Sequence, residues 1–528
     1  MNPDQSTKVL FGDKATQALM KGVNLVCDAT ATTLGPRGRN VAIDKGYTHI
    51  VLHDGVSVSE SINPKDPYEK LGAKIIKEAA KKQRDQVGDG TTAVMILAKA
   101  ILKESLKATA SGINPMSLRE GLEEGSEIIV KEIKKQSKPI KTLEQKIQVA
   151  SISAGDKELG KMIAETRHKI GDDGVMVVEE SKMPETLIEM QDGMQFERGY
   201  AHPFMITEPE RMVAVLEDVH VLISDIPLNN LVDIGKFLEK EVLGKGVNKM
   251  VFITPEVGGD FLSALLGAKV GGKFLGLVVK NPMAGNHAIE FLQDLCAMTG
   301  AKLVSKEAGH KFEDIDLTWC GKIGRIVSTK VSTTITKGAG LKNDILQRIA
   351  VIKKQMGDED LSDFDKEKLK ERLAKLTSGV AVVKVGGETE VEMKERKERA
   401  IDAISATTAA IKYGIVAGGE IPYLSAREAL ESTTLGQKIL YDALSEPFKK
   451  LVSNAGYDSG EMLSDWKHKG DRTIGFDVVK GEWMSMIESG ILDPTSVLTT
   501  AVKTAVSCAV AIMSIGACVV PEDKDEKK

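Results

Sequence analysis

The stretch VGDGTTAVMILAKAI, Val87 to Ile101, holds the pattern that decides the fold of this chain. Two glycines flank Asp89, two threonines follow, and the apolar residues then recur three and four positions apart, as on one face of a helix. A helix that begins here offers free backbone N–H groups and the positive end of its dipole to an anion. The stretch predicts either a capped helix or a phosphate site.

Asp89 separates these two interpretations. Aspartate is a preferred N-cap, so the residue can simply begin the helix. Beside a phosphate, by contrast, its carboxylate is repelled unless a divalent cation lies between the two groups. On this stretch alone both interpretations stay open.

Composition limits the class of protein. A chain of 528 residues is too long for one core, so several domains are expected. Its 42% apolar and 28% charged residues fit a globular protein. With 71 basic and 76 acidic residues the net charge is -5, which predicts neither nucleic acid nor a membrane as partner.

The cysteines and the two ends of the chain indicate a cytoplasmic protein. Five scattered cysteines without a CxxC pair favour neither a disulfide framework nor a zinc site. The first twenty residues lack the pattern of a secretory signal. The longest apolar run, Ala505 to Val520, is too short to span a bilayer and predicts a buried helix. The polar tail PEDKDEKK is expected to be disordered.

Periodicity divides the chain into three parts. The N-terminal part is mainly helical and includes one predicted hairpin, in which Val41 and Ile43 alternate before a Lys45-Gly46 turn. From about Gly171, the strand patterns GVMVVEE, VHVLISD, KMVFIT and FLGLVVKN alternate with helical ones, which predicts an α/β domain. A charged amphipathic helix is predicted from Leu361, and helical patterns return after the strand VAVVKVGG. We expect the two helical ends to form one domain that carries the middle as an insertion.

Other clusters of glycine and acid favour a nucleotide site. TTLGPRGRN and GIVAGGE contain glycine turns, and single aspartates occur in HDGVS, AIDAI and GILDPT. An aspartate on an apolar helix face is costly unless it is paired or binds a ligand. Each cluster alone is explained by a turn or a cap, whereas the set favours a nucleotide. Gly267 to Lys273 also satisfies GxxxxGK, but Phe274 replaces the required Ser or Thr, so no phosphate site is predicted there.

These motifs resemble those of one family. TLGPRGRNV, HDGVSV, GDGTT, DGMQFERGY, VEMKERKERAIDA, GIVAGG and GILDPT occur in the order and spacing seen in the bacterial-type (group I) 60-kDa chaperonins, the GroEL family. The resemblance runs from about Lys14 to Val520. It implies a multi-domain α and α/β chaperonin fold with a helical equatorial ATPase domain (1–136 and 411–528), a small intermediate domain (137–191 and 379–410) and an inserted α/β apical domain (192–378).

The same resemblance implies the function and the partners. The protein would be an ATP-driven chaperonin that binds non-native proteins on apical apolar surfaces and folds them inside a ring-shaped chamber. Its subunits would form a seven-membered homo-oligomeric ring, single or double. The resemblance does not decide whether a co-chaperonin closes the ring as a lid. ATP and Mg²⁺ are the implied cofactors. K⁺ is a further candidate ion that the resemblance does not decide. Two alternatives are a scaffold that kept the fold without the cycle and an ATP-dependent enzyme acting on a small substrate.

Site residues are carried over by motif. Asp402 would orient or deprotonate the attacking water, Asp54 would assist, and Asp89 would hold Mg²⁺. The nucleotide would contact Thr33, Leu34, Gly35, Pro36, His53, Asp89, Gly90, Thr91, Thr92, Ala93, Gly418, Gly419, Asp477, Val478, Val479 and Asp493. Non-native protein would contact Tyr200, Phe204, Met205, Leu238, Leu262 and Leu266. Nearby methionines fit a surface of this kind, although they can equally fill the apical core.

Three site positions depart from the family pattern. His53 replaces a lysine, Glu420 replaces the third glycine of a glycine triple, and Asp477 replaces an asparagine. None of these changes removes Asp89 or Asp402, so ATP hydrolysis is expected to survive.

Overall fold

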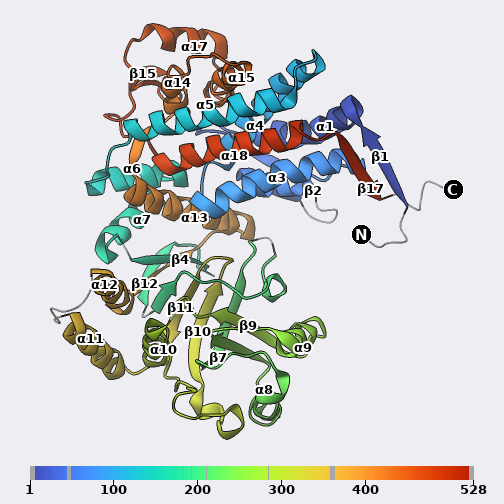
Figure 1. The fold of residues 1–528 in the computed structure, drawn as a ribbon. Helices are drawn as coiled ribbons and strands as arrows, with labels where there is room; N and C mark the ends of the chain where they lie inside the picture. The colour runs from blue at the N-terminus through green and yellow to red at the C-terminus, as the bar shows by residue number, and fades with distance from the viewer. Residues whose placement is uncertain are drawn as a thin grey trace. The chain divides into compact units, whose positions relative to one another are not determined.

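A computed structural model describes residues 6–44, 49–172, 174–181, 183–191, 193–209, 211–283, 285–356, 363–377 and 379–521. The chain forms two compact units (Figure 1). The first unit comprises Met1–His168, Val178–Leu187 and Val383–Lys528, and the second comprises Lys169–Val177 and Ile188–Val382.

The first unit is mainly helical. Its helices are α1 (Gly12–Ala31), α2 (Gly55–Ser61), α3 (Pro67–Val87), α4 (Thr91–Ala110), α5 (Pro115–Gln136), α6 (Leu143–Ala154), α7 (Lys157–Ile170), α13 (Glu390–Tyr413), α14 (Ile421–Arg427), α15 (Leu435–Ala443), α16 (Glu446–Asn454), α17 (Ser459–His468) and α18 (Thr495–Met513). In Figure 1, α1, α3, α4, α5 and α18 run side by side, and their buried residues form one core.

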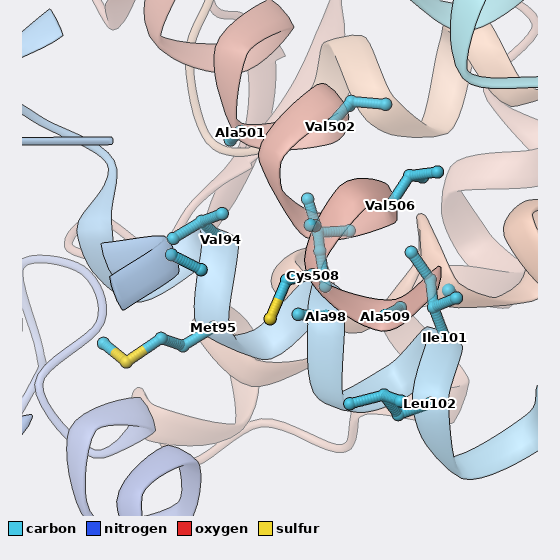
Figure 2. Packing of buried hydrophobic residues seen from close by; sticks show 14 of the residues in the cluster. Val94, Met95, Ala98, Ile101, Leu102, Ala501, Val502, Val506, Cys508 and Ala509 are labelled. Atoms are coloured by element: carbon cyan, nitrogen blue, oxygen red, sulfur yellow. The ribbon is translucent and has the colours of Figure 1, made fainter. Parts of the chain in front are cut away.

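Helix α4 lies inside this core. Val94 to Ala98 are five consecutive buried residues, so the helix is covered on all sides rather than along one stripe. Figure 2 shows Ala98 and Ile101 of α4 beside Val506 and Ala509 of α18. The apolar run that follows GDGTT therefore makes α4 a central helix of the first unit.

Helix α18 is the other central helix. Among the described helices it alone is long and apolar enough, by length and composition, to cross a membrane, with a mean hydropathy of 1.6. Core helices of soluble proteins pass the same test, and 78% of this window is buried inside the protein. The prediction of a buried helix is confirmed up to Met513. The prediction was wrong beyond it, because the apolar run leaves the helix and Ala517–Pro521 form strand β17.

Short antiparallel strand pairs complete the first unit. They are β1 (Thr7–Phe11) with β17 (Ala517–Pro521), β2 (Val41–Asp44) with β3 (His49–Leu52), β13 (Ile415–Ala417) with β16 (Leu492–Pro494), and β14 (Ile474–Asp477) with β15 (Glu482–Ser485). The predicted hairpin is confirmed, with Ile43 opposite Ile50. Its Lys45-Gly46 turn and the tail residues 522–528 lie outside the described residues.

The second unit is built on a six-stranded sheet. Its strands are β6 (Gly193–Phe196), β7 (Ala214–Ile223), β8 (Lys249–Thr254), β9 (Leu275–Lys280), β10 (Gly321–Ser328) and β11 (Thr333–Gly338), in the order β6-β11-β10-β7-β8-β9. The β7-β8 and β8-β9 pairs are parallel, whereas the others are antiparallel. The predicted α/β alternation is confirmed, and β8 and the middle of β9 are buried, as their continuous apolar runs predict.

The remaining elements of the second unit cover this sheet. They are α8 (Leu231–Phe237), α9 (Gly259–Val270), α10 (Asn286–Thr299), α11 (Lys342–Met356) and α12 (Asp363–Thr377), with short turns of helix at Pro203–Met205, Leu238–Val242, Leu243–Lys245, Phe312–Asp314 and Leu317–Trp319. Figure 1 shows α10, α11 and α12 on one side of the sheet, and α8 and α9 on the other. A three-stranded sheet of β4 (Val175–Glu180), β12 (Val380–Val385) and β5 (Leu187–Gln191) contains the strands in which the chain passes between the units.

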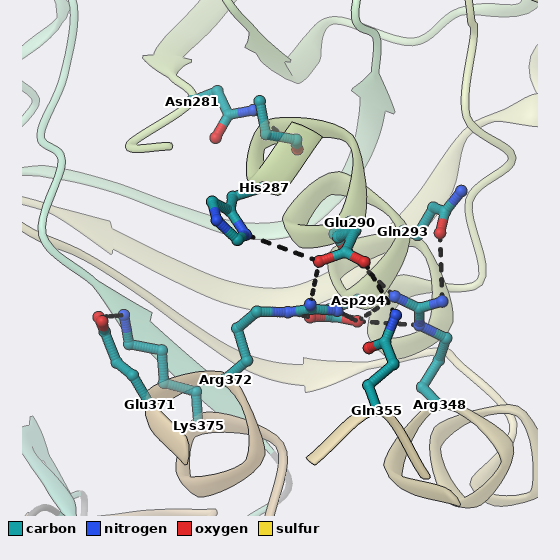
Figure 3. A network of polar contacts seen from close by, with 11 residues as sticks. Asn281, His287, Glu290, Gln293, Asp294, Arg348, Gln355, Glu371, Arg372 and Lys375 are labelled. Atoms are coloured by element: carbon teal, nitrogen blue, oxygen red, sulfur yellow. Dashed lines mark hydrogen bonds and ion pairs between the residues drawn. The ribbon is translucent and has the colours of Figure 1, made fainter. Parts of the chain in front are cut away.

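A buried cluster of ion pairs joins α10, α11 and α12 (Figure 3). Asp294 of α10 has a side chain only 1% exposed, and its Oδ2 accepts a hydrogen bond from Nε of Arg372 at 2.8 Å. Its Oδ1 accepts from Nε of Arg348 on α11 at 2.9 Å. The charged helix predicted from the sequence is therefore observed as α12, although Leu361 lies outside the described residues and its single arginine, Arg372, is buried rather than solvated.

Candidate nucleotide site

Two left-handed glycines shape the loop between α3 and α4. Gly88 ends α3 with φ +75°, and Gly90 precedes α4 with φ +78°. Glycine adopts this backbone region without strain, so the GDG sequence can reverse the chain within three residues. The first N–H groups of α4 then point out of the helix start, where they have no partner within the helix.

Asp89 is not the cap of α4. The N-cap is Gly90, and no side chain caps the helix. Oδ1 of Asp89 instead accepts a hydrogen bond from the N–H of Gly90 at 2.6 Å, and Oδ2 accepts one from Oγ of Ser153 on α6 at 3.0 Å. Burial raises the pKa of Asp89, while these two hydrogen bonds lower it. The interpretation that Asp89 merely caps the helix is wrong, because its carboxylate faces α6.

Gln83 ties the loop to the core of the first unit. Its Nε2 donates to the carbonyl oxygens of Asp89 and Val497, both at 3.0 Å. Gln83 is fully buried on α3, six residues before the loop. We did not identify this residue from the sequence, because its second partner is 414 positions away.

The threonine turn lies beside the start of α4. Oγ1 of Thr33 is 3.4 Å from Oγ1 of Thr92. Nδ2 of Asn454 donates to the carbonyl of Leu34 at 3.0 Å, and Gly35 has φ +82°. The structure thus brings the 33–36 segment, in which Pro36 follows the left-handed glycine, next to Thr91 and its neighbours.

Three carboxylates from three separate segments lie near this loop. Asp54 is the N-cap of α2 and accepts from the N–H of Ser57 at 2.7 Å. Asp402 lies on α13, and its pKa is raised well above its ordinary value, first by burial and then by the charges of Asp89 and Asp54. The structure therefore assembles the three acids that the motifs contain.

This donor set fits a magnesium ion bound with a nucleotide. Within the described ranges, no three His, Cys, Asp or Glu side chains are placed to hold a metal between them. Mg²⁺ usually needs only one or two protein carboxylates, since phosphate oxygens and water complete its shell. The negative charges of Asp89 and Asp54 raise the pKa of Asp402. A bound divalent cation would offset this negative charge.

Gly418, Gly419 and Asp493 form another part of the site. Strands β13 and β16 place Val416 opposite Asp493, and the N–H of Gly418 donates to the carbonyl of Ile491 at 2.8 Å. Burial, with a further contribution from Asp89, raises the pKa of Asp493 to about 7. The negative charge of Asp89 therefore acts on the carboxyl group of Asp493.

Glu420 also belongs here, although we noted it from the sequence only as a departure from the family pattern. It has φ +63°, a conformation that glycine adopts without strain. Its pKa is raised to about 8, first by burial and then by the charges of Asp493 and Asp89. An acidic residue on a left-handed backbone, within the electrostatic influence of Asp493, is therefore a feature of this chain.

Asp477 and His53 make local contacts. Oδ1 of Asp477 accepts from the N–H of Val479 at 2.9 Å, so this carboxylate shapes its own turn between β14 and β15. The carbonyl of Val479 accepts from Arg37 at 3.4 Å, which connects the turn, including buried Val478, to the threonine segment. Nδ1 of His53 lies 3.0 Å from Oδ1 of Asn40, and burial lowers the pKa of His53, so it is not a fixed positive charge.

The proposed client-binding residues of the second unit differ in how much of each side chain is exposed to solvent. Phe204 is 68% exposed, whereas Tyr200 and Met205 are buried. The sulfur of Met205 accepts from the N–H of Val278 at 3.4 Å, so Met205 fills the core here. Leu238, Leu262 and Leu266 are partly buried against the same core. Val232 and Val270 are also strongly exposed, each at 84%.

Comparison with known proteins agrees with this architecture. The sequence matches the TCP-1/cpn60 chaperonin family over residues 26–242 and 266–523, and the chain belongs to this family. The structure resembles two crystal forms of the chaperonin gp146 from the bacteriophage EL 2 (Pseudomonas aeruginosa), both in the presence of ATP-BeFx. Form II matches with a TM-score of 0.69 and form I with 0.63, each at 20% identity over 98% of this chain and 99% of that chain. The expected chaperonin fold is confirmed.

Proposed function

We propose that this chaperonin hydrolyses ATP at the start of α4 and uses the hydrolysis to time the binding and folding of non-native proteins. The observation that carries the proposal is the packing of three segments at one glycine loop: Ser405 of α13 lies against Gly88, and Gly55 lies against Thr92, which brings Asp402 and Asp54 near Asp89. These carboxylates lie on α2, α13 and the α3–α4 loop, and no single segment could assemble them. Asp402, whose pKa is raised by burial and by the charges of Asp89 and Asp54, is unfavourable for stability alone, and groups perturbed in this way cluster at functional sites.

Each residue has a physical role in this proposal. Gly90, Thr91, Thr92 and Ala93 cradle the phosphates at the positive end of α4, and the N–H groups of the last three face them, because the N–H of Gly90 donates to Asp89. Asp89 holds Mg²⁺, which neutralises phosphate charge when it is bound. Asp402 orients or deprotonates the attacking water, assisted by Asp54. Attack on a γ-phosphate depends mainly on positioning and charge neutralisation, and this set of residues supplies both.

The finer features follow the motif resemblance and belong to the same proposal. We assign the chain to the bacterial-type group I chaperonins, in seven-membered rings whose number is open. Exposed apolar residues such as Phe204 bind client proteins. A co-chaperonin lid and K⁺ are further proposed components. Five free cysteines are compatible with the proposed cytoplasmic location.

ATP turnover tests the proposal. Asp402→Ala should bind ATP, hydrolyse it at least about 100-fold more slowly and lose refolding of a denatured client. Asp13→Ala, which removes an exposed carboxylate on α1, is the matched control and should retain turnover. A wild-type protein that binds clients without hydrolysing ATP would contradict the proposal and favour a scaffold that has lost the cycle.

A further inference from the structure

Helices α6 and α13 pack along each other within the first unit, and both contact the GDG loop. From α6, Oγ of Ser153 donates to Oδ2 of Asp89 at 3.0 Å. From α13, Ser405 lies against Gly88, where an added Cβ would be 2.1 Å from the Cβ of Ser405. Two neighbouring residues of the loop therefore meet two serines from one helix pair.

Helix α6 also contacts the segment before Asp493. A Cβ on Gly490 would lie 2.4 Å from Nε2 of Gln148, so the side chain of Gln148 packs against residue 490. Gly490 lies two residues before β16, the strand that pairs with β13. The helix pair thus touches both the loop with Asp89 and the segment with Asp493.

The hydrogen bonds of the Asp89 carboxylate show how Ser153 acts on it. An ionised carboxylate has about four lone-pair positions. The N–H of Gly90 occupies one on Oδ1, and the Ser153 hydroxyl occupies one on Oδ2. In the described part of the chain, Ser153 is the one side chain that hydrogen-bonds to this carboxylate. Together the two donors fix the rotation of the carboxylate and leave one position on each oxygen for a cation.

We propose that Ser153 is a positioning residue for the cation ligand Asp89, and that its hydroxyl holds the carboxylate in the orientation that a divalent cation needs. Groups that hold a metal ligand from outside the coordination shell orient it and increase its affinity. Because Ser153 lies on α6, its hydroxyl reaches Asp89 only while α6 lies at the loop. This inference rests on the proposed ATP site.

A binding experiment tests this role without relying on turnover. Affinity for a non-hydrolysable ATP analogue is measured by calorimetry in EDTA and across a Mg²⁺ titration, for wild type, Ser153→Ala and Ser153→Thr. Ser153→Ala should lower Mg²⁺ affinity about 10- to 100-fold and leave the affinity in EDTA unchanged. Ser153→Thr keeps the hydroxyl and should restore wild-type Mg²⁺ affinity. Ser151→Ala, a change of the same kind on the same helix, should match wild type.

The outcomes separate this inference from the function on which it rests. Equal Mg²⁺ affinity in Ser153→Ala and wild type would overturn the positioning role and leave the ATP site standing. If Ser153→Ala lowered the affinity for the analogue equally in EDTA and in Mg²⁺, the positioning role would also be overturned, because an equal loss would indicate a general structural role. Failure of wild type to bind the analogue under either condition would overturn the proposed function itself.

Discussion

Ser405 of α13 lies so close to Gly88 that a Cβ placed on Gly88 would be 2.1 Å from the Cβ of Ser405. Asp402 is three positions before Ser405, about one helical turn away and on the same side of α13. The helix that carries Asp402 can reach the loop only because residue 88 has no side chain. Gly88 thus serves two purposes, since its φ of +75° also ends α3.

Gly88→Ala should displace α13 and slow ATP turnover. A shift of about 1 Å at a reacting group can cost about 100-fold in rate. The matched control is Gly112→Ala, because Gly112 also has positive φ, +93°, but an added Cβ there meets nothing within 4 Å. Steady-state ATPase rates of the two variants isolate the contact with Ser405 from backbone strain.

A second substitution strengthens this test. Ser405→Gly removes the Cβ that Gly88→Ala would meet, so the double variant should recover part of the lost turnover. Equal loss in Gly88→Ala and Gly112→Ala would show that strain, and not the α13 contact, causes the defect.

Stability should fall as pH rises towards 8, because of Glu420 and Asp493. Their pKa values in the folded protein are about 8 and about 7, against ordinary values of 4.5 and 3.8. The folded state keeps these protons after the unfolded chain has released them. The resulting stabilisation is therefore fully present below the ordinary values and is lost as pH rises through the folded ones.

Glu420→Gln should reduce this pH dependence, since glutamine does not titrate. Urea midpoints measured between pH 5 and 9 give the slope for each protein. The pH dependence of stability that remains in the variant is due to Asp493 and other titrating groups. An unchanged slope would contradict the raised pKa of Glu420.

Asp294→Asn should destabilise the protein strongly. The buried Asp294 carboxylate binds Arg372, whose side chain is 1% exposed, and Arg348. Removing one partner of a buried pair costs about 3 to 5 kcal/mol, because the other charge stays buried without compensation. Glu313→Gln breaks an exposed pair with Lys236 in the same unit and should cost far less, because solvent screens this pair. Urea unfolding that gives equal costs for the two would contradict the burial of this cluster.

Two adjacent residues should respond differently to alanine. Phe204→Ala should weaken binding of a denatured client while changing the free energy of unfolding by no more than about 0.5 kcal/mol, because Phe204 is exposed. Met205→Ala should cost about 2 to 5 kcal/mol, because Met205 is 1% exposed in the core. Unfolding and client-binding measurements on both variants check this difference, and similar unfolding costs would contradict it.

Local patterns in the sequence were sufficient for much of the fold. The alternation around Val41 and Ile50 predicted the β2–β3 hairpin, and the continuous apolar runs predicted β8 and β9. These elements depend on neighbours in the chain, so periodicity and turn residues define them. The motifs also contained Asp54, Asp89 and Asp402, which the structure places together.

Contacts between distant residues decided the rest. Asp89 looked like a cap from its position before a helix, but its partner Ser153 lies 64 positions away and on another helix. Phe204 and Met205 are neighbours in one short turn, yet one faces solvent and the other the core. A sequence determines which groups are present and how each segment prefers to fold. Only tertiary packing decides which groups meet, because burial and hydrogen bonding depend on segments that lie far apart along the chain.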